Sequence, residues 1–294
     1  MSDSNASSVA LVPARALTCQ KQPILRYGDL PARRFAISAH KPPRETRVPT
    51  CTDQIQTWFD GKPISRAAVL TWEAGRARKG LRKFGAPSVS GTDLAALRKM
   101  LAEAKLGMGR AAIERRLARE ITVSDRLTGL LARGSRGQRR LSQVELLVPG
   151  ATAEQLPAWY AARTDADDET AFLTATPDHH LFRPVADANG QEVWETTGGS
   201  SVASRFFIDI GSDEGLVTEP DARYPVQMVG CARLANGTVL GGIRHQFRNE
   251  RNGARVLLTV EFPSLMGPIG PAAHRWHLAS EFANWMQASA PATS

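Results

Sequence analysis

The spacing of hydrophobic positions changes near residue 141. Before that point, apolar residues recur at helical spacing, first at Ile55, Trp58 and Phe59 and then over residues 67–84, 94–107 and 110–121. After it, short stretches of strand-like alternation follow one another, and one amphipathic helix is predicted over residues 271–287. The pattern predicts an α+β protein in which a small helical region precedes an antiparallel sheet and a long C-terminal helix.

Asn-Gly pairs interrupt the second half at residues 189–190, 236–237 and 252–253, each between β-prone stretches. Both residue types accept the positive φ that tight hairpin turns require, so the pairs predict a meandering antiparallel sheet. A curved sheet closed by a C-terminal helix is a helix-grip fold, and its interior can hold a small molecule. We therefore expect an extended arm over residues 1–50, a basic helical region over 51–140 and a helix-grip domain over 141–290.

Charge divides the chain at almost the same place as the hydrophobic pattern. Residues 1–143 contain 27 Lys and Arg against 11 Asp and Glu, whereas residues 144–294 contain 10 against 18. Three widely spaced cysteines argue against a disulfide framework or a thiolate metal site. Since no long apolar span and no secretory signal stand out, we expect a soluble, cytoplasmic protein with no membrane partner.

The basic half offers one route to a partner. Two Arg-rich helices predicted to meet around Gly107–Gly109 could form a helix-turn-helix that binds nucleic acid. The alternative is a helical cover with a solvated basic face, which we favour because no set of base-reading residues stands out.

The predicted C-terminal helix carries a polar stripe. At 100° per residue, His274, His277, Glu281 and Asn284 fall within an arc of about 80°. His277 and Glu281 have the i, i+4 spacing at which two side chains of one helix can reach the same metal ion. Further His and carboxylate residues upstream, in ATPDHHLF and EVWETTGG, strengthen a metal-site hypothesis.

Four segments in this order, VPGATAEQLPAWY, ATPDHHLF, VWETTGG and HLASEFAN, resemble the diacetylphloroglucinol and phloretin hydrolases. That family is made up of zinc enzymes that hydrolyse the carbon–carbon bond between an acyl group and a polyhydroxylated aromatic ring. The resemblance covers about half of the chain. Position by position, it implies zinc (Zn²⁺) ligands at His180, Glu195, His277 and Glu281.

The same resemblance points to two further side chains, which are our candidates for catalytic residues. His245 in GGIRHQF matches a further cavity histidine, and Asn284 matches the last residue of the family's His-x-x-x-Glu-x-x-Asn pattern. Phe172 and Ala175 stand where the family has Tyr and Trp, so recognition of the ring is expected to differ. The expected substrate is a small acyl-phenolic or β-diketone compound.

The two adjacent histidines require a choice. Strand neighbours point to opposite faces, so only one of His179 and His180 can enter the cavity, and the match to Pro-x-x-His selects His180. His179 and His274 are then expected in outer or surface positions. A two-residue turn at Asn189–Gly190 would place Glu195 opposite Pro184, about 13 Å from His180, unless Pro184 breaks the ladder.

The mechanistic hypothesis is attack of a metal-bound water on the acyl carbonyl, with His245 transferring a proton and Asn284 orienting a ligand or substrate oxygen. Two other functions are possible alternatives: a helix-grip module that binds a phenolic or polyketide ligand without turnover, and nucleic-acid binding by the basic half. The oligomeric state is a further open question, and a homodimer is one possibility.

Overall fold

The computed structural model of the protein describes residues 54–86, 93–185 and 190–290. Its strands are β1 (Gln56–Phe59), β2 (Lys62–Ile64), β3 (Arg139–Pro149), β4 (His179–Pro184), β5 (Gly190–Glu195), β6 (Ser204–Ile210), β7 (Val226–Arg233), β8 (Val239–Glu250) and β9 (Gly253–Pro263). Its helices are α1 (Arg66–Lys83), α2 (Leu94–Met108), α3 (Arg110–Ser135), α4 (Gln155–Asp165), α5 (Glu169–Ala175) and α6 (Ile269–Ala288). The arm expected over residues 1–50 lies outside the described residues.

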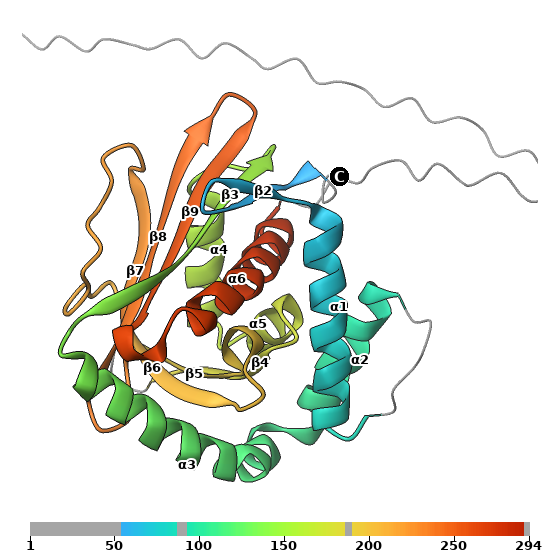
Figure 1. Ribbon diagram of the computed structural model, residues 1–294. Coiled ribbons are helices and arrows are strands. Elements are labelled where there is room, and N and C mark those ends of the chain that lie inside the picture. Colours follow the sequence, from blue (N-terminus) through green and yellow to red (C-terminus); the bar gives the residue numbers. More distant parts are fainter. Residues whose placement is uncertain (1–53, 87–92, 186–189, 291–294) are drawn as a thin grey trace, which may run out of the picture. The chain divides into compact units, whose positions relative to one another are not determined.

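The α+β class is confirmed. Within the described residues, the strands form one antiparallel sheet of nine in the order β2-β1-β3-β9-β8-β7-β6-β5-β4. The sheet curves round α6, and α1 flanks α6 on the side away from β3 (Figure 1). None of the described helices has the length and apolar character needed to cross a membrane.

The main core lies between the sheet and α6. Alternate residues of β3, including Val144, Leu146 and Val148, are buried on one face, as expected for a strand with one face on the core. They share a hydrophobic cluster with Leu278 and Phe282 of α6. The C-terminal helix therefore fills the concave side of the sheet.

Strands β4 and β5 are buried on both faces. Phe182 and Val193 belong to the core beside α6, whereas their neighbours Leu181 and Trp194 pack into a second cluster with α1, α2 and α3. Almost every residue of the two strands is buried as a result. Adjacent side chains on these strands thus enter different interiors.

Most of the predicted elements are confirmed, and α3 runs on to Ser135 rather than ending near Ile121. The Asn-Gly pairs at 236–237 and 252–253 do lie at the β7–β8 and β8–β9 connections. The helix expected from Ile55 is wrong: β1 and β2 form a hairpin around Asp60 and Gly61, which have φ of 50° and 74°. Asp-Gly is a strong signal for a two-residue turn and outweighs three apolar residues at helical spacing.

The start of α6 is fixed by a close approach of the turn that follows β5. A Cβ atom on Gly198 would lie 2.3 Å from the Cα of His274, and Gly198 has a φ of 36°. Any larger residue would therefore push the turn away from the helix and strain its own backbone.

We expect Gly198→Ala to lower the free energy of unfolding by about 3 kcal/mol, because α6 must shift to accept the methyl group. Gly75→Ala is the control: a Cβ at this exposed position of α1 would have none of the described residues within 4 Å. It should leave stability unchanged or raise it by up to about 1 kcal/mol. Urea unfolding measures the stability of both variants. If Gly198→Ala were as stable as the wild type, the close approach of Gly198 to His274 would be contradicted.

Candidate metal centre

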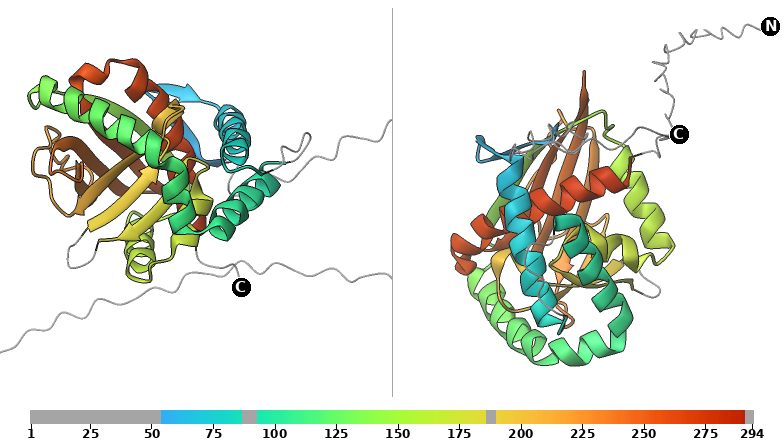
Figure 2. Two further views of the ribbon diagram at one scale, coloured as in Figure 1. Left: turned by 90° about the horizontal axis from the view of Figure 1, so that it is seen from below. Right: turned by 90° about the vertical axis from the view of Figure 1, so that its right-hand side faces the viewer.

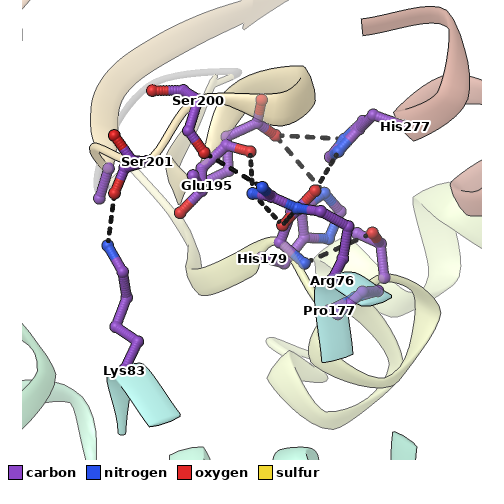
Figure 3. A network of polar contacts seen from close by, with 12 residues as sticks. Arg76, Lys83, Pro177, His179, Glu195, Ser200, Ser201 and His277 are labelled. Carbon is purple, nitrogen blue, oxygen red and sulfur yellow. Dashed lines mark hydrogen bonds and ion pairs between the residues drawn. The ribbon is translucent and has the colours of Figure 1, made fainter. Parts of the chain in front are cut away.

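Four side chains with metal-binding groups meet where β4, β5 and α6 come together. His179 begins β4 and Glu195 ends β5, and the two residues are paired in the ladder. His277 and Glu281 are one turn apart on α6. All four are at most 6% exposed. Figure 3 shows His179, Glu195 and His277 directed toward one another.

Each carboxylate lies close to both imidazoles. His179 Nε2 is 3.0 Å from an oxygen of Glu281 and 3.5 Å from one of Glu195. His277 Nε2 is 3.4 Å and 3.6 Å from oxygens of the same two residues. Nitrogen and oxygen ligands bound tetrahedrally to a small divalent ion, at about 2.0–2.1 Å, lie about 3.3 Å apart. The spacing and the donor set therefore fit a metal ion.

Both histidines are oriented by contacts through their other ring nitrogen. His179 Nδ1 is 3.0 Å from the carbonyl oxygen of Phe172, so it donates there, and its buried Nε2 faces the carboxylates of Glu281 and Glu195. His277 Nδ1 is 3.4 Å from a carboxylate oxygen of Asp178. Such outer contacts fix the tautomer and leave Nε2 available as a ligand, as at many metal sites.

Asp178 is in turn held by the basic half of the chain. Arg76 of α1 donates Nε to Asp178 over 2.7 Å and also donates to the carbonyl oxygens of Ser200 and Thr196. Both charged side chains are buried (Figure 3 shows Arg76 beside the site). The guanidinium group thus connects α1 to Asp178, the residue before β4, and to the turn after β5.

His274 joins the group from the preceding turn of α6. Glu195, His274 and His277 offer one ligand atom each within 4.8 Å of one another, as do His179, His277 and Glu281. The rings of His274 and His277 stack at 5.0 Å, and the buried Nδ1 of His274 has no hydrogen-bond partner among the described residues. His179 therefore belongs to the group rather than to an outer or surface position, and His274 is buried directly beside it.

The cluster of His179, Glu195, His277 and Glu281 has different effects on the pKa values of its own histidines and of the neighbouring His274. Burial lowers the pKa of His277, but Glu195 and Glu281 outweigh it and raise this pKa well above its usual value. In the same way, the two carboxylates raise the pKa of His179 against the effect of burial. Burial favours the protonated form of Glu281, yet His179 and His277 hold its pKa low. Burial, aided by His277, lowers the pKa of His274 to about 3, so this ring is neutral.

His180 does not face the cluster, and its assignment as a ligand is corrected. The β4–β5 ladder pairs His179 with Glu195 and Leu181 with Trp194, so His180 is the extra residue of a β-bulge. Its Nε2 lies 2.6 Å from Thr196 Oγ1, and its ring packs on Phe84. Its place is on the opposite face of β4, among the helices.

The register also brings Glu195 nearer than expected. Pro184 pairs with Gln191 rather than with Glu195, so the predicted separation of about 13 Å does not arise. Residues 186–189, including Asn189 of the expected turn, lie outside the described residues. Glu195, His277 and Glu281 come together as the motifs suggested, but with His179 as their fourth member.

The two expected catalytic residues have different surroundings. His245 lines the same cavity as the cluster and packs its ring on Phe282. Asn284 instead donates to Glu73 and to the carbonyl oxygen of Ala175, and it accepts a hydrogen bond from Arg98. Asn284 therefore links α6 to α1, α2 and α5 and does not line the cavity, which corrects its assignment as a catalytic residue.

Sequence reasoning missed three buried charged residues behind the cluster: Arg76, Lys105 and Asp178. Lys105 donates to the carbonyl oxygens of Pro177 and His179, and burial lowers its pKa to about 7. The only available signal was Asp178 itself, a carboxylate inside the His-containing motif. Arg76 is 102 positions away in sequence, and no local pattern marks it.

Glu195, His277 and Glu281 form part of the lining of a cavity of about 560 Å³ between α3, the sheet and α6. Seen from below, α3 crosses the end of the sheet beside the start of α6 (Figure 2). Cavities of about 300–1,000 Å³ hold small organic ligands. The candidate metal centre is thus accessible to a small molecule.

The chain matches no protein-family model and no curated protein. Its function is therefore inferred from the site itself.

The raised pKa of His277 has a consequence for the metal-free protein. A histidine whose pKa is raised on folding stabilises the protein fully below its usual pKa of about 6.5, and this contribution is lost as the pH rises through the raised value. His277→Gln should therefore destabilise the chelator-treated protein more at pH 6.5 than at pH 9, by at least about 1 kcal/mol.

His180→Gln is the matched control. The pKa of His180 lies well below its usual value because of burial, so this ring is neutral throughout that range. Its effect on the urea-unfolding free energy should not change between pH 6.5 and 9. Equal pH dependence in the two variants would contradict a charged His277.

Proposed function

We propose that this protein is a zinc-dependent hydrolase that cleaves the carbon–carbon bond between an acyl group and a polyhydroxylated aromatic ring, or the equivalent bond of a β-dicarbonyl compound. The observation that carries the proposal is a buried cluster in which His179 and His277 each lie within 3.6 Å of both Glu195 and Glu281, beside a cavity of suitable size. The order of the four sequence motifs supports it. We also propose that the curved sheet and α6 form a helix-grip fold.

The ligand set proposed for zinc is His179, Glu195, His277 and Glu281. The two glutamates balance the charge of a divalent cation, and the two Nε2 atoms provide its nitrogen ligands. Bound zinc lowers the pKa of a water molecule and polarises a carbonyl group. Asp178 keeps His277 oriented through Nδ1, and the unpartnered Nδ1 of His274 adds a neutral polar group beside Glu195.

The reaction is redox-neutral. Water adds its oxygen to the acyl carbon, the bond between that carbon and the ring breaks, and the ring carbon takes up a proton. The products are a carboxylic acid and the free phenol. As the bond breaks, negative charge moves to an oxygen of the ring, so a hydrogen-bond donor at that oxygen lowers the barrier.

His245 is the residue proposed for this task. Its Nδ1 accepts a hydrogen bond from the backbone N–H of Thr259 over 3.3 Å, so Nε2 carries the proton. Burial lowers the pKa of His245 to about 4, which keeps the ring neutral near pH 7. A neutral imidazole with a fixed tautomer can stabilise a developing oxyanion by hydrogen bonding. Full proton transfer by His245 stays a prediction.

The adjacent histidines provide the sharpest test of the metal site. His179→Gln should lower zinc affinity by more than about 100-fold, beyond the effect of losing an outer partner, and abolish hydrolysis. His180→Gln should bind zinc stoichiometrically, because its side chain lies on the other face of β4. Zinc content and affinity are measured on folded, purified protein. Retention of zinc by His179→Gln, or its loss from His180→Gln, would refute the ligand set.

His245→Gln should keep full zinc and lower kcat by about 100-fold, the usual effect of removing one donor from an oxyanion site. Asn284→Ala serves as the comparison, because Asn284 contacts Glu73, Arg98 and Ala175 instead of the cavity. It should lose about 1–3 kcal/mol of stability through unpaired polar groups while kcat per zinc-loaded molecule stays unchanged. A kcat equal to wild type in His245→Gln would exclude the proposed role.

A further inference from the structure

The cavity has two chemically different ends. The polar end holds Glu195, His277 and Glu281. Away from it, the wall consists of apolar side chains from the sheet, α3 and η3, the short 3₁₀ turn Ser264–Met266, among them Ile208, Met228, Ile243, Leu131 and Met266. A ligand that fills the cavity therefore meets polar groups at one end and hydrocarbon along the rest.

Several polar side chains along the apolar arm are paired within the protein. Ser124 of α3 and Ser204 of β6 share a hydrogen bond of 2.8 Å, and Arg205 forms an ion pair of 2.7 Å with Asp125. Glu261 accepts hydrogen bonds from the backbone N–H groups of Val217 and Thr218 and from the Thr218 hydroxyl. A polar ligand group in this arm would lose its hydration without gaining these partners.

Apolar side chains continue to the surface where the cavity opens. Val123 and Leu127 of α3 are 59% and 55% exposed, and Ile269 at the start of α6 is 82% exposed. All three also line the cavity that contains the His/Glu cluster. Leu130, on the next turn of α3, is 61% exposed but lies outside that lining. The exposed leucines of α3 therefore divide into one at the cavity and one away from it.

We propose that the ligand of this cavity is an amphiphile with an oxygenated head at the His/Glu cluster and a long alkyl or prenyl chain that runs past α3 to Leu127. The head is the acyl-phenol or β-dicarbonyl group of the proposed function, on which this part of the inference rests. The chain replaces water along the apolar wall and covers the exposed side chains at the mouth. Binding and turnover should both depend on chain length.

The binding test uses 1-alkylphloroglucinols from methyl to octyl, which carry no acyl bond to hydrolyse, with zinc-loaded protein in a calorimeter. Each added methylene that is buried should tighten binding by up to about fourfold. Hydrolysis of acetyl-, butanoyl-, hexanoyl- and octanoylphloroglucinol should show the same trend in kcat/KM. An affinity that does not change with chain length would overturn the proposal.

Leu127→Ser and Leu130→Ser form a matched pair on one helix, with similar exposure and little risk to folding. Leu127→Ser should weaken octylphloroglucinol binding by about tenfold and leave methylphloroglucinol unaffected. Leu130→Ser should change neither. Equal losses in both variants would show that the exposed face of α3 packs against another molecule, and would overturn the assignment.

The outcomes separate this inference from the proposed hydrolase. Chain-length-dependent binding that requires Leu127, with no hydrolysis of any acyl compound, would support the amphiphile and refute the hydrolase. Hydrolysis at the same kcat/KM for every chain length would support the hydrolase and refute the amphiphile.

Discussion

The placement of two carboxylates, Glu195 and Glu281, in the interior is the constraint on which the rest of this structure depends. Buried anions are strongly unfavourable unless positive groups lie beside them, and removal of one partner leaves an uncompensated charge. His179 and His277 provide that charge when they are protonated, and a divalent cation can replace their protons. The same cluster therefore accounts for the cohesion of β4, β5 and α6 and makes this place suitable for a metal ion.

The charge asymmetry of the sequence is partly explained by this interior. Arg76 from the basic half pairs with Asp178, and Lys105 binds the carbonyl oxygens that flank it. On the surface, Arg110 pairs with Asp167 and Glu169. The basic helices are thus more than a solvated cover, because their cations stabilise the acidic half where its carboxylates are buried.

Short-range signals predicted the elements well, and long-range pairing limited the prediction of the site. His277 and Glu281 were found because helical periodicity alone puts them on one face. The choice between His179 and His180 failed because it depends on a β-bulge, which shifts the register without any sequence signature. Arg76 could not be found, since its contact with Asp178 arises only once α1 packs beside α6. Asp60–Gly61 was a local signal that the helical spacing of Ile55, Trp58 and Phe59 obscured.

Burial of β4 and β5 on both faces explains how neighbouring residues serve different purposes. The inner face carries His179 and Glu195 of the candidate metal centre, whereas the outer face anchors the helices through Leu181 and Trp194. Helix α3 is divided in the same way: Leu117 and Ile121 complete the outer core, while Val123 and Leu127 stay exposed beside the cavity. Folding leaves the apolar side chains of Val123 and Leu127 in contact with water, and their position at the mouth of the cavity lets an apolar ligand cover them.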